Sequence, residues 1–314
     1  MIWKKIKKFL PIIGIGIFIY LILKLDFIKI FQEIKTLNIP YLLIAIFLVF
    51  VFLTSQTFKW FIIARKQKIK IPFFEAFKIN LISNFYGFIT PSKIGSIIRI
   101  NYIKKYSGEI GKSISNFVID KIFDISSLFV FVIIFGFLFY TEMKIMSLNS
   151  LYLFLIIFLM IIFIFLLFYK KKSSQFILGF FYKRFIPHKI KEKARGTFNS
   201  FYENIPSLSF LLIAFFFNIV SWLLDYLAVY FVGLSLGINV GFWVFLAILP
   251  ISTLVGQIPV TIGGLGTREL VLINLFGLFG VGAVKIFSMS LVTLIINSII
   301  PSIIGSILSL KQKG

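Results

Sequence analysis

Residues 91–99 read Pro-Ser-Lys-Ile-Gly-Ser-Ile-Ile-Arg, and residues 259–269 read Pro-Val-Thr-Ile-Gly-Gly-Leu-Gly-Thr-Arg-Glu. When the two prolines are aligned, Arg99 falls next to Arg268, and each segment lies between two mostly apolar stretches. Helix breakers and cations are costly inside a membrane, because freed backbone groups and charges need partners there. Paired interruptions in the two halves of a membrane protein indicate a binding site built from broken helices.

The composition defines the class of protein. The chain has 314 residues, of which 59% are hydrophobic and only 14% charged, and its mean hydropathy is +1.02. A soluble domain of this length could not cover so much apolar surface with polar groups. We therefore expect an all-α, polytopic transmembrane helix bundle.

Six stretches come close to or exceed the ~20 apolar residues that a helix needs to cross a bilayer. They are 9–25, 40–58, 117–140, 151–169, 208–235 and 286–310. Two further apolar stretches, 73–106 and 241–284, contain the proline-glycine segments.

The formal net charge of +22 does not indicate nucleic-acid binding, because the lysines and arginines occur in short clusters between apolar stretches. The positive-inside rule explains such clusters as cytoplasmic loops. The N-terminus is basic and is followed by no small-residue cleavage site, so we expect an uncleaved first span. The interpretation is a multi-pass protein of the cell (plasma) membrane with both termini cytoplasmic. The absence of cysteine and the single histidine argue against disulfides and a His/Cys metal site, and no cofactor is expected.

Charge counting also predicts the topology. Segments 59–70 and 99–112 are both basic, so both should be cytoplasmic, and 73–106 would then enter the membrane and return as a re-entrant hairpin. By the same reasoning 241–284 forms a hairpin entering from the outside. About six full spans and two hairpins would make an inverted repeat with halves of about 1–145 and 146–314. The alternative is two kinked helix pairs, which would give ten spans.

The cations of the two segments suggest an anion site, most simply for a phosphate. A helix starting after each break would direct its free N–H groups and its positive dipole end into the site, beside the cations. The predicted substrate-binding residues are Lys93, Arg99, Gly263, Gly264, Arg268 and Glu269. The alternative for Lys93 and Arg99 is that they reach the cytoplasmic headgroups.

The acids near the spans are few. Asp120 and Asp124 share one face of a helix, with Lys121 beside them, and suit ion pairing with Arg99 or Arg268. Asp225 lies in the middle of a span with no neutralising neighbour in the sequence, which makes it a functional candidate. We assign Asp120, Lys121, Asp124 and Asp225 to supporting ion pairs.

The loop 170–207 interleaves apolar residues with lysines and arginines, which indicates an amphipathic helix on the cytoplasmic surface. The apolar residues are Phe176, Ile177, Phe180, Phe181 and Phe185. A partner-docking role is the alternative for this loop. The sequence contains no nucleophile–base motif, no P-loop and no metalloprotease motif. We therefore expect a protein that is not an enzyme.

The chain resembles the prokaryotic membrane-protein family that includes the transmembrane part of lysylphosphatidylglycerol synthase. Three motifs carry the resemblance, in the family's order and spacing, over essentially the whole chain. They comprise Pro91, Ser92, Lys93, Gly95, Ser96 and Arg99; Asp120, Lys121 and Asp124; and Pro259, Ile262, Gly263, Gly264, Leu265, Gly266 and Glu269.

The chain departs from the family pattern at four positions: Ser96 replaces a glutamate, Ile262 a proline, and Lys93 and Lys121 arginines. In the bacterial synthases, the resemblance implies that this membrane part moves a charged lipid across the bilayer. The soluble synthase domain is absent here, so its chemistry is not implied.

The leading hypothesis is a flippase-like transporter of a phosphate-bearing phospho- or polyprenyl lipid, with membrane lipids as its binding partners. The alternative is a non-transporting accessory subunit that binds lipid phosphate beside a membrane-bound glycosyltransferase or lipid-synthesis enzyme.

Overall fold

The computed structural model describes residues 16–140, 147–176, 188–258, 261 and 264–311. Within these ranges the regular structure is helical, and no strand is present. Five helices are long and apolar enough to span a membrane. They are α3 (Ile39–Lys66), α6 (Ile110–Leu138), α8 (Leu148–Tyr169), α11 (Leu208–Ser235) and the continuous helix Ala283–Lys311. The all-α polytopic bundle is thereby confirmed.

Five of the six expected spans thus correspond to observed helices. The sixth, 9–25, is helical over Gly16–Leu25, and its first residues lie outside the described part of the chain. It is followed by α2 (Phe27–Lys35), whose first turn is capped by Asp26. The last span consists of α14 (Ala283–Leu294), a π-helical turn η2 (Ile295–Ile299) and α15 (Ile300–Lys311).

Both interrupted stretches form two short helices joined at the proline-glycine segment. The first comprises α4 (Phe73–Phe88), the 3-10 turn η1 (Ile94–Ile98) and α5 (Arg99–Ser107). The second comprises α12 (Phe242–Gly256) and α13 (Thr267–Gly277). At 1.5 Å per residue the longest of these helices, α4 with 16 residues, is about 24 Å long, short of the ~30 Å hydrocarbon core. These lengths favour hairpins over the ten-span alternative.

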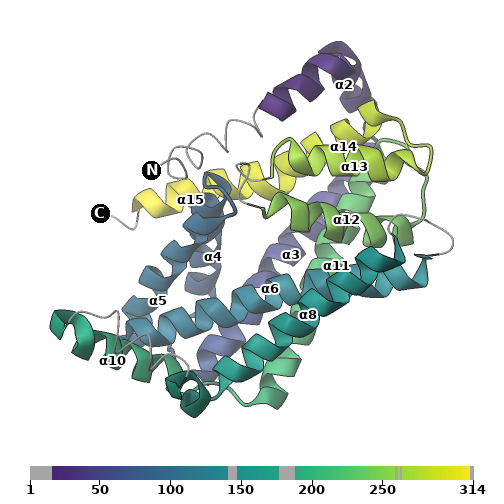
Figure 1. The fold of residues 1–314 in the computed structure, drawn as a ribbon. Coiled ribbons are helices and arrows are strands. Elements are labelled where there is room, and N and C mark those ends of the chain that lie inside the picture. Colours follow the sequence, from purple (N-terminus) through teal and green to yellow (C-terminus); the bar gives the residue numbers. More distant parts are fainter. Residues whose placement is uncertain (1–15, 141–146, 177–187, 259–260, 262–263, 312–314) are drawn as a thin grey trace.

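The packing is reciprocal between the two halves of the chain (Figure 1). The helices α3 and α11 pack against each other at the centre of the bundle. The first arm of each hairpin packs against the last span of the other half, α4 on α15 and α12 on α6. An internal two-fold repeat would produce this exchange, although the repeat itself and the halves 1–145 and 146–314 stay predictions.

A polar contact and a glycine shape the first break. The backbone N–H of Gly95 donates to Thr90 Oγ1 at 2.7 Å, and that hydroxyl donates to the Tyr86 carbonyl at 2.8 Å. A Cβ on Gly95 would lie 2.1 Å from the same carbonyl oxygen, so only glycine fits. Ser92 and Lys93 both adopt left-handed backbone angles, with φ of 52° and 55°. The tip carrying Lys93 is therefore held in a conformation that L-residues rarely adopt.

The second break relies on close backbone approach. Gly264 has φ of 80°, and a Cβ there would lie 2.9 Å from the Cα of Gly256 at the end of α12. The N–H of Gly266 donates to Glu269 Oε2 at 2.6 Å at the start of α13. Gly263, a predicted site residue, lies outside the described residues.

The helix α10 (His188–Tyr202) lies in the loop where an amphipathic helix was predicted. It packs against α6, where Gly111 approaches the backbone of Thr197 and Phe201 so closely that a Cβ would clash. Phe180, Phe181 and Phe185 of the same prediction lie outside the described residues. In the described part of this loop, α10 therefore lies against the bundle.

Candidate functional site

Arg99 is part of a buried ion-pair network. Its side chain is 3% exposed, its Nη2 donates to Asp120 Oδ2, and its guanidinium lies 5.0 Å from the ring centre of Trp60 and 5.1 Å from that of Phe117. Aromatic faces attract a cation, more strongly when water is excluded. The predicted pairing of Asp120 with an arginine is therefore present, and Arg99 lies between α3 and α6 with little surface left for a ligand.

Lys59 is the centre of this network, and the sequence interpretation missed it. Its fully buried ammonium lies 2.6 Å from Asp120 Oδ1, 2.7 Å from Asp124 Oδ1 and 2.7 Å from Asn218 Oδ1. Two of these contacts, to Asp124 and Asn218, are hydrogen bonds and the third is an ion pair with Asp120, and together they join α3, α6 and α11. The span predicted from the sequence ends at residue 58 and leaves Lys59 in the basic segment 59–70, whereas the helix α3 continues to Lys66 and places Lys59 inside the bundle. The sequence signal that could have found Lys59 is the pair Asp120 and Asp124, two acids within one span that need cationic partners from other helices.

Lys121 lies on the same network but is partly open. Its Nζ is 2.9 Å from Asp124 Oδ2, and its side chain is 40% exposed. Asp124 thus bridges the buried Lys59 and the accessible Lys121. An anion approaching Lys121 would compete with Asp124 for the ammonium group.

The second hairpin contributes Arg268 and Glu269. The Nη2 of Arg268 donates to Ser290 Oγ at 2.8 Å, and its Nε lies 3.4 Å from Glu269 Oε1. Glu269 is buried, and besides Gly266 N–H it accepts from Ser290 Oγ at 2.8 Å. Glu269 therefore fixes the start of α13 and neutralises Arg268, while Arg268 keeps part of its surface exposed.

Asp225 faces both hairpins from α11. Its Oδ1 accepts from Asn297 Nδ2 at 2.6 Å, and its carboxylate interacts electrostatically with Lys93 and Arg268. Lys93 is exposed, interacts with Lys121, Arg268, Asp225 and Asp124 at longer range, and forms no ion pair within 4.0 Å in the described part of the chain. The fold thus brings Lys93 within electrostatic range of Lys121 and Arg268, which come from two other segments.

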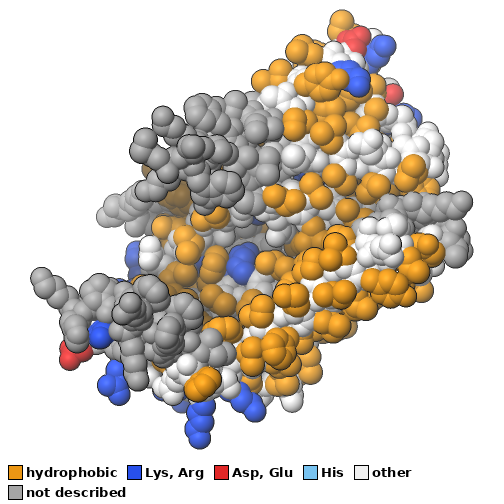
Figure 2. Space-filling model, in the orientation of Figure 1, with side chains coloured by type: hydrophobic (Ala, Val, Ile, Leu, Met, Phe, Trp, Pro, Cys, Tyr) orange, Lys and Arg blue, Asp and Glu red, His pale blue; other side chains and the backbone are white. Residues whose placement is uncertain are grey.

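The charges of this site do not cancel. Five cations, Lys59, Lys93, Arg99, Lys121 and Arg268, face four acids, Asp120, Asp124, Asp225 and Glu269. The excess positive charge falls on Lys93. Figure 2 shows a hollow near the centre of one face in which a Lys or Arg side chain lies among hydrophobic groups. Such an accessible cation between apolar walls suits the anionic end of an amphiphile.

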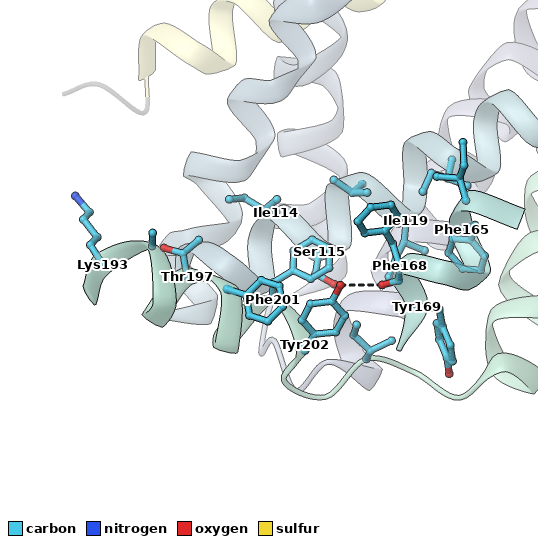
Figure 3. A pocket seen from close by; sticks show the side chains of 16 residues that line it. Ile114, Ser115, Ile119, Phe165, Phe168, Tyr169, Lys193, Thr197, Phe201 and Tyr202 are labelled. Atoms are coloured by element: carbon cyan, nitrogen blue, oxygen red, sulfur yellow. Dashed lines mark hydrogen bonds between the residues drawn. The ribbon is translucent and has the colours of Figure 1, made fainter. Parts of the chain in front are cut away.

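A second cavity, of about 820 Å³, lies between α6, α8 and α10 (Figure 3). Its walls are mostly apolar, and the hydroxyl of Tyr202 donates to Phe168 O at 2.8 Å, while that of Tyr169 donates to Pro206 O at 3.0 Å. None of the predicted site residues lines it. The cavity occupies the face of α6 opposite to Asp120 and Asp124.

Among the described residues, no group of three or more His, Cys, Asp or Glu side chains could hold a metal ion.

Residues 11–305 match the family model described as the lysylphosphatidylglycerol synthase TM region. The chain belongs to this family. The chain is also similar to a UPF0104 membrane protein of Pyrococcus horikoshii, 27% identical over 98% of both chains. A UPF0104 membrane protein of Methanocaldococcus jannaschii is 25% identical over 91% of both chains.

The resemblance inferred from the three motifs is thereby confirmed.

Proposed function

We propose that this protein is a flippase-like transporter of a phosphate-bearing lipid, not an enzyme, in the plasma membrane with cytoplasmic termini. The observation that carries the proposal is the convergence of Lys93, Lys121 and Arg268 on one site, with Lys93 unpaired by any described acid within 4.0 Å. A lipid phosphate would bind there as an anion, and its hydrocarbon chains would stay in the surrounding bilayer.

The ion-pair network assigns different roles to the predicted residues. Lys93, Lys121 and Arg268 are accessible and would contact the phosphate, whereas Arg99 and Glu269 are buried and would position the two hairpins. Movement of the hairpins relative to the spans would expose the site to one membrane face and then to the other. The sequence has no ATP-binding motif, so an ion gradient or the membrane potential would drive net movement.

The test is lipid movement in proteoliposomes, with labelled phospholipid and labelled polyprenyl phosphate assayed separately. Removing a charge-assisted hydrogen bond costs about 1.5–3 kcal/mol, so Lys93→Ala and Arg268→Ala should each slow transport by roughly tenfold or more. Lys78→Ala is the matched control, because Lys78 lies on the same hairpin but pairs with Glu75 at 2.7 Å.

Equal transport by wild type, Lys93→Ala and Arg268→Ala, or no transport by any of them, would refute the transporter. Lipid binding that depends on Lys93 without any movement would instead support the accessory subunit for envelope lipid or glycan synthesis. Co-purification with a membrane-bound glycosyltransferase or lipid-synthesis enzyme would then identify the partner.

A further inference from the structure

A small polar cavity of about 50 Å³ lies where α11, α12 and α13 meet the last span. Oxygen-bearing side chains line it from three of these helices: Asp225 from α11, Ser252 and Thr253 from α12, and Thr293 and Asn297 from the last span. A cavity needs at least about 10–15 Å³ to hold one water, so this cavity admits a small ion or a few waters but no lipid group.

Several of these oxygens have no partner. Thr293 Oγ1 and Asn297 Oδ1 are buried and form no hydrogen bond, and the Thr293 residue is only 6% exposed. The hydroxyls of Ser252 and Thr253 both donate to the Leu249 carbonyl at 2.8 Å, and the Ser252 oxygen keeps its lone pairs available, while Thr253 also faces the hydroxyl of Tyr226. Buried polar atoms rarely lack partners in proteins, so the convergence of these oxygens on one cavity indicates a site suited to a small polar ligand.

The cavity wall contains one carboxylate that lacks an ion-pair partner in the described part of the chain. Arg268 also lines the cavity, but its charge is offset by Glu269 at 3.4 Å and its Nη2 is bonded to Ser290. Asp225 forms no ion pair within 4.0 Å among the described residues and receives one hydrogen bond, from Asn297. One carboxylate therefore faces several neutral oxygens.

The backbone around the cavity supports the same conclusion. Asn297 lies in the π-helical turn Ile295–Ile299, and such turns interrupt helices mostly at functional sites. Ser252 and Thr253 lie in the last turns of α12, whose C-terminal dipole end attracts positive charge. Half-helix C-terminal ends coordinate Na⁺ in transporters with broken helices.

We propose that this cavity binds a monovalent cation, Na⁺, with Asp225, Thr293 and Asn297 as ligands and Ser252 and Thr253 completing the oxygen shell. A single carboxylate suits a monovalent ion, because Ca²⁺ takes six to eight oxygen ligands and Mg²⁺ keeps several waters. The cavity is too small for a hydrated divalent ion.

Lys93 and Arg268 interact electrostatically with Asp225 and oppose a cation there. An anion bound to Lys93 would remove part of this opposition, so the two ligands would strengthen each other's binding by equal amounts. This coupling rests on the proposed function, whereas the cation site does not.

The experiment is ²²Na⁺ binding to the full chain in nanodiscs of phosphatidylglycerol, with competition by NaCl or by choline chloride at equal ionic strength. We expect saturable binding of one Na⁺ per chain, displaced by NaCl and not by choline. Thr293→Val should weaken binding about tenfold without loss of thermal stability, because it removes a hydroxyl that has no partner. Asp225→Asn should abolish binding, and Glu75→Gln is the matched control.

Absence of saturable binding, or unchanged affinity in Thr293→Val and Asp225→Asn, would overturn the cation site. A site that responds to acidification but not to Na⁺ would also overturn it, because Asp225 would then bind a proton. Failure of lipid transport in proteoliposomes would leave the Na⁺ result unaffected, so the two proposals fail separately.

Discussion

Replacing Lys59 by methionine is the most direct test of the buried network. The substitution keeps most of the side-chain volume but removes an ammonium that contacts Asp120, Asp124 and Asn218 at 2.6–2.7 Å. Asp120 would keep Arg99 and Asp124 would keep Lys121, while Asn218 Oδ1 would lose its donor. Breaking a buried ion pair costs about 3–5 kcal/mol, and we expect Lys59→Met to cost that much.

The measurement is thermal unfolding in detergent, followed by tryptophan fluorescence. At about 2–4 °C per kcal/mol for chains of comparable size, the midpoint should fall by roughly 10 °C. Lys78→Met is the control, because Lys78 and Glu75 form a partly exposed pair whose loss should cost below about 1 kcal/mol. If the two variants lowered the midpoint equally, the buried network would not hold the three helices together.

Three further predictions concern other parts of the molecule. Gly95→Ala should destabilise the first hairpin and abolish transport, because its Cβ would lie 2.1 Å from a backbone carbonyl; a variant with wild-type transport and unfolding midpoint would contradict this. Arg99→Lys should lower the unfolding midpoint, because lysine cannot keep both the Asp120 contact and the planar stacking on Trp60; an unchanged midpoint would show that the stacking is unimportant. The hydrogen bond from Lys112 at 2.7 Å lowers the pKa of Glu203, so the stabilisation from this pair is present above about pH 4.3 and is lost as the pH falls through the lowered pKa. The difference in midpoint between wild type and Glu203→Gln should therefore shrink in acid, and a difference that grows in acid would be inconsistent with it.

The spans could be predicted from the sequence, because hydrophobic length alone determines which segments can cross a bilayer. The ion-pair partners of the charged residues could not be predicted in this way. Lys59 and Asp124 lie 65 positions apart, and their contact depends on how α3, α6 and α11 pack. Because basic residues follow Lys59 in the sequence, it was grouped with them in segment 59–70, although the helix α3 continues to Lys66.

The same limit applies within the first hairpin. Lys93 and Arg99 appeared equivalent in the sequence, since both are cations following Pro91. The structure separates them, because Ser92 and Lys93 take left-handed backbone angles at the tip while Arg99 begins a helix packed on α6. Which face of that helix meets α6 is a property of the packed bundle and is not encoded in local spacing.

The Lys59 contacts also distinguish helices that are tied together from the hairpin tips, which are not part of these contacts. One ammonium group joins α3 to two acids of α6 and to Asn218 of α11, and α3 and α6 cannot separate without leaving buried charges uncompensated. In the proposed transport, these three helices would form a stationary frame. The hairpin tips would move relative to it, and Lys93 and Arg268, the accessible cations carried by the two hairpins, would travel with them.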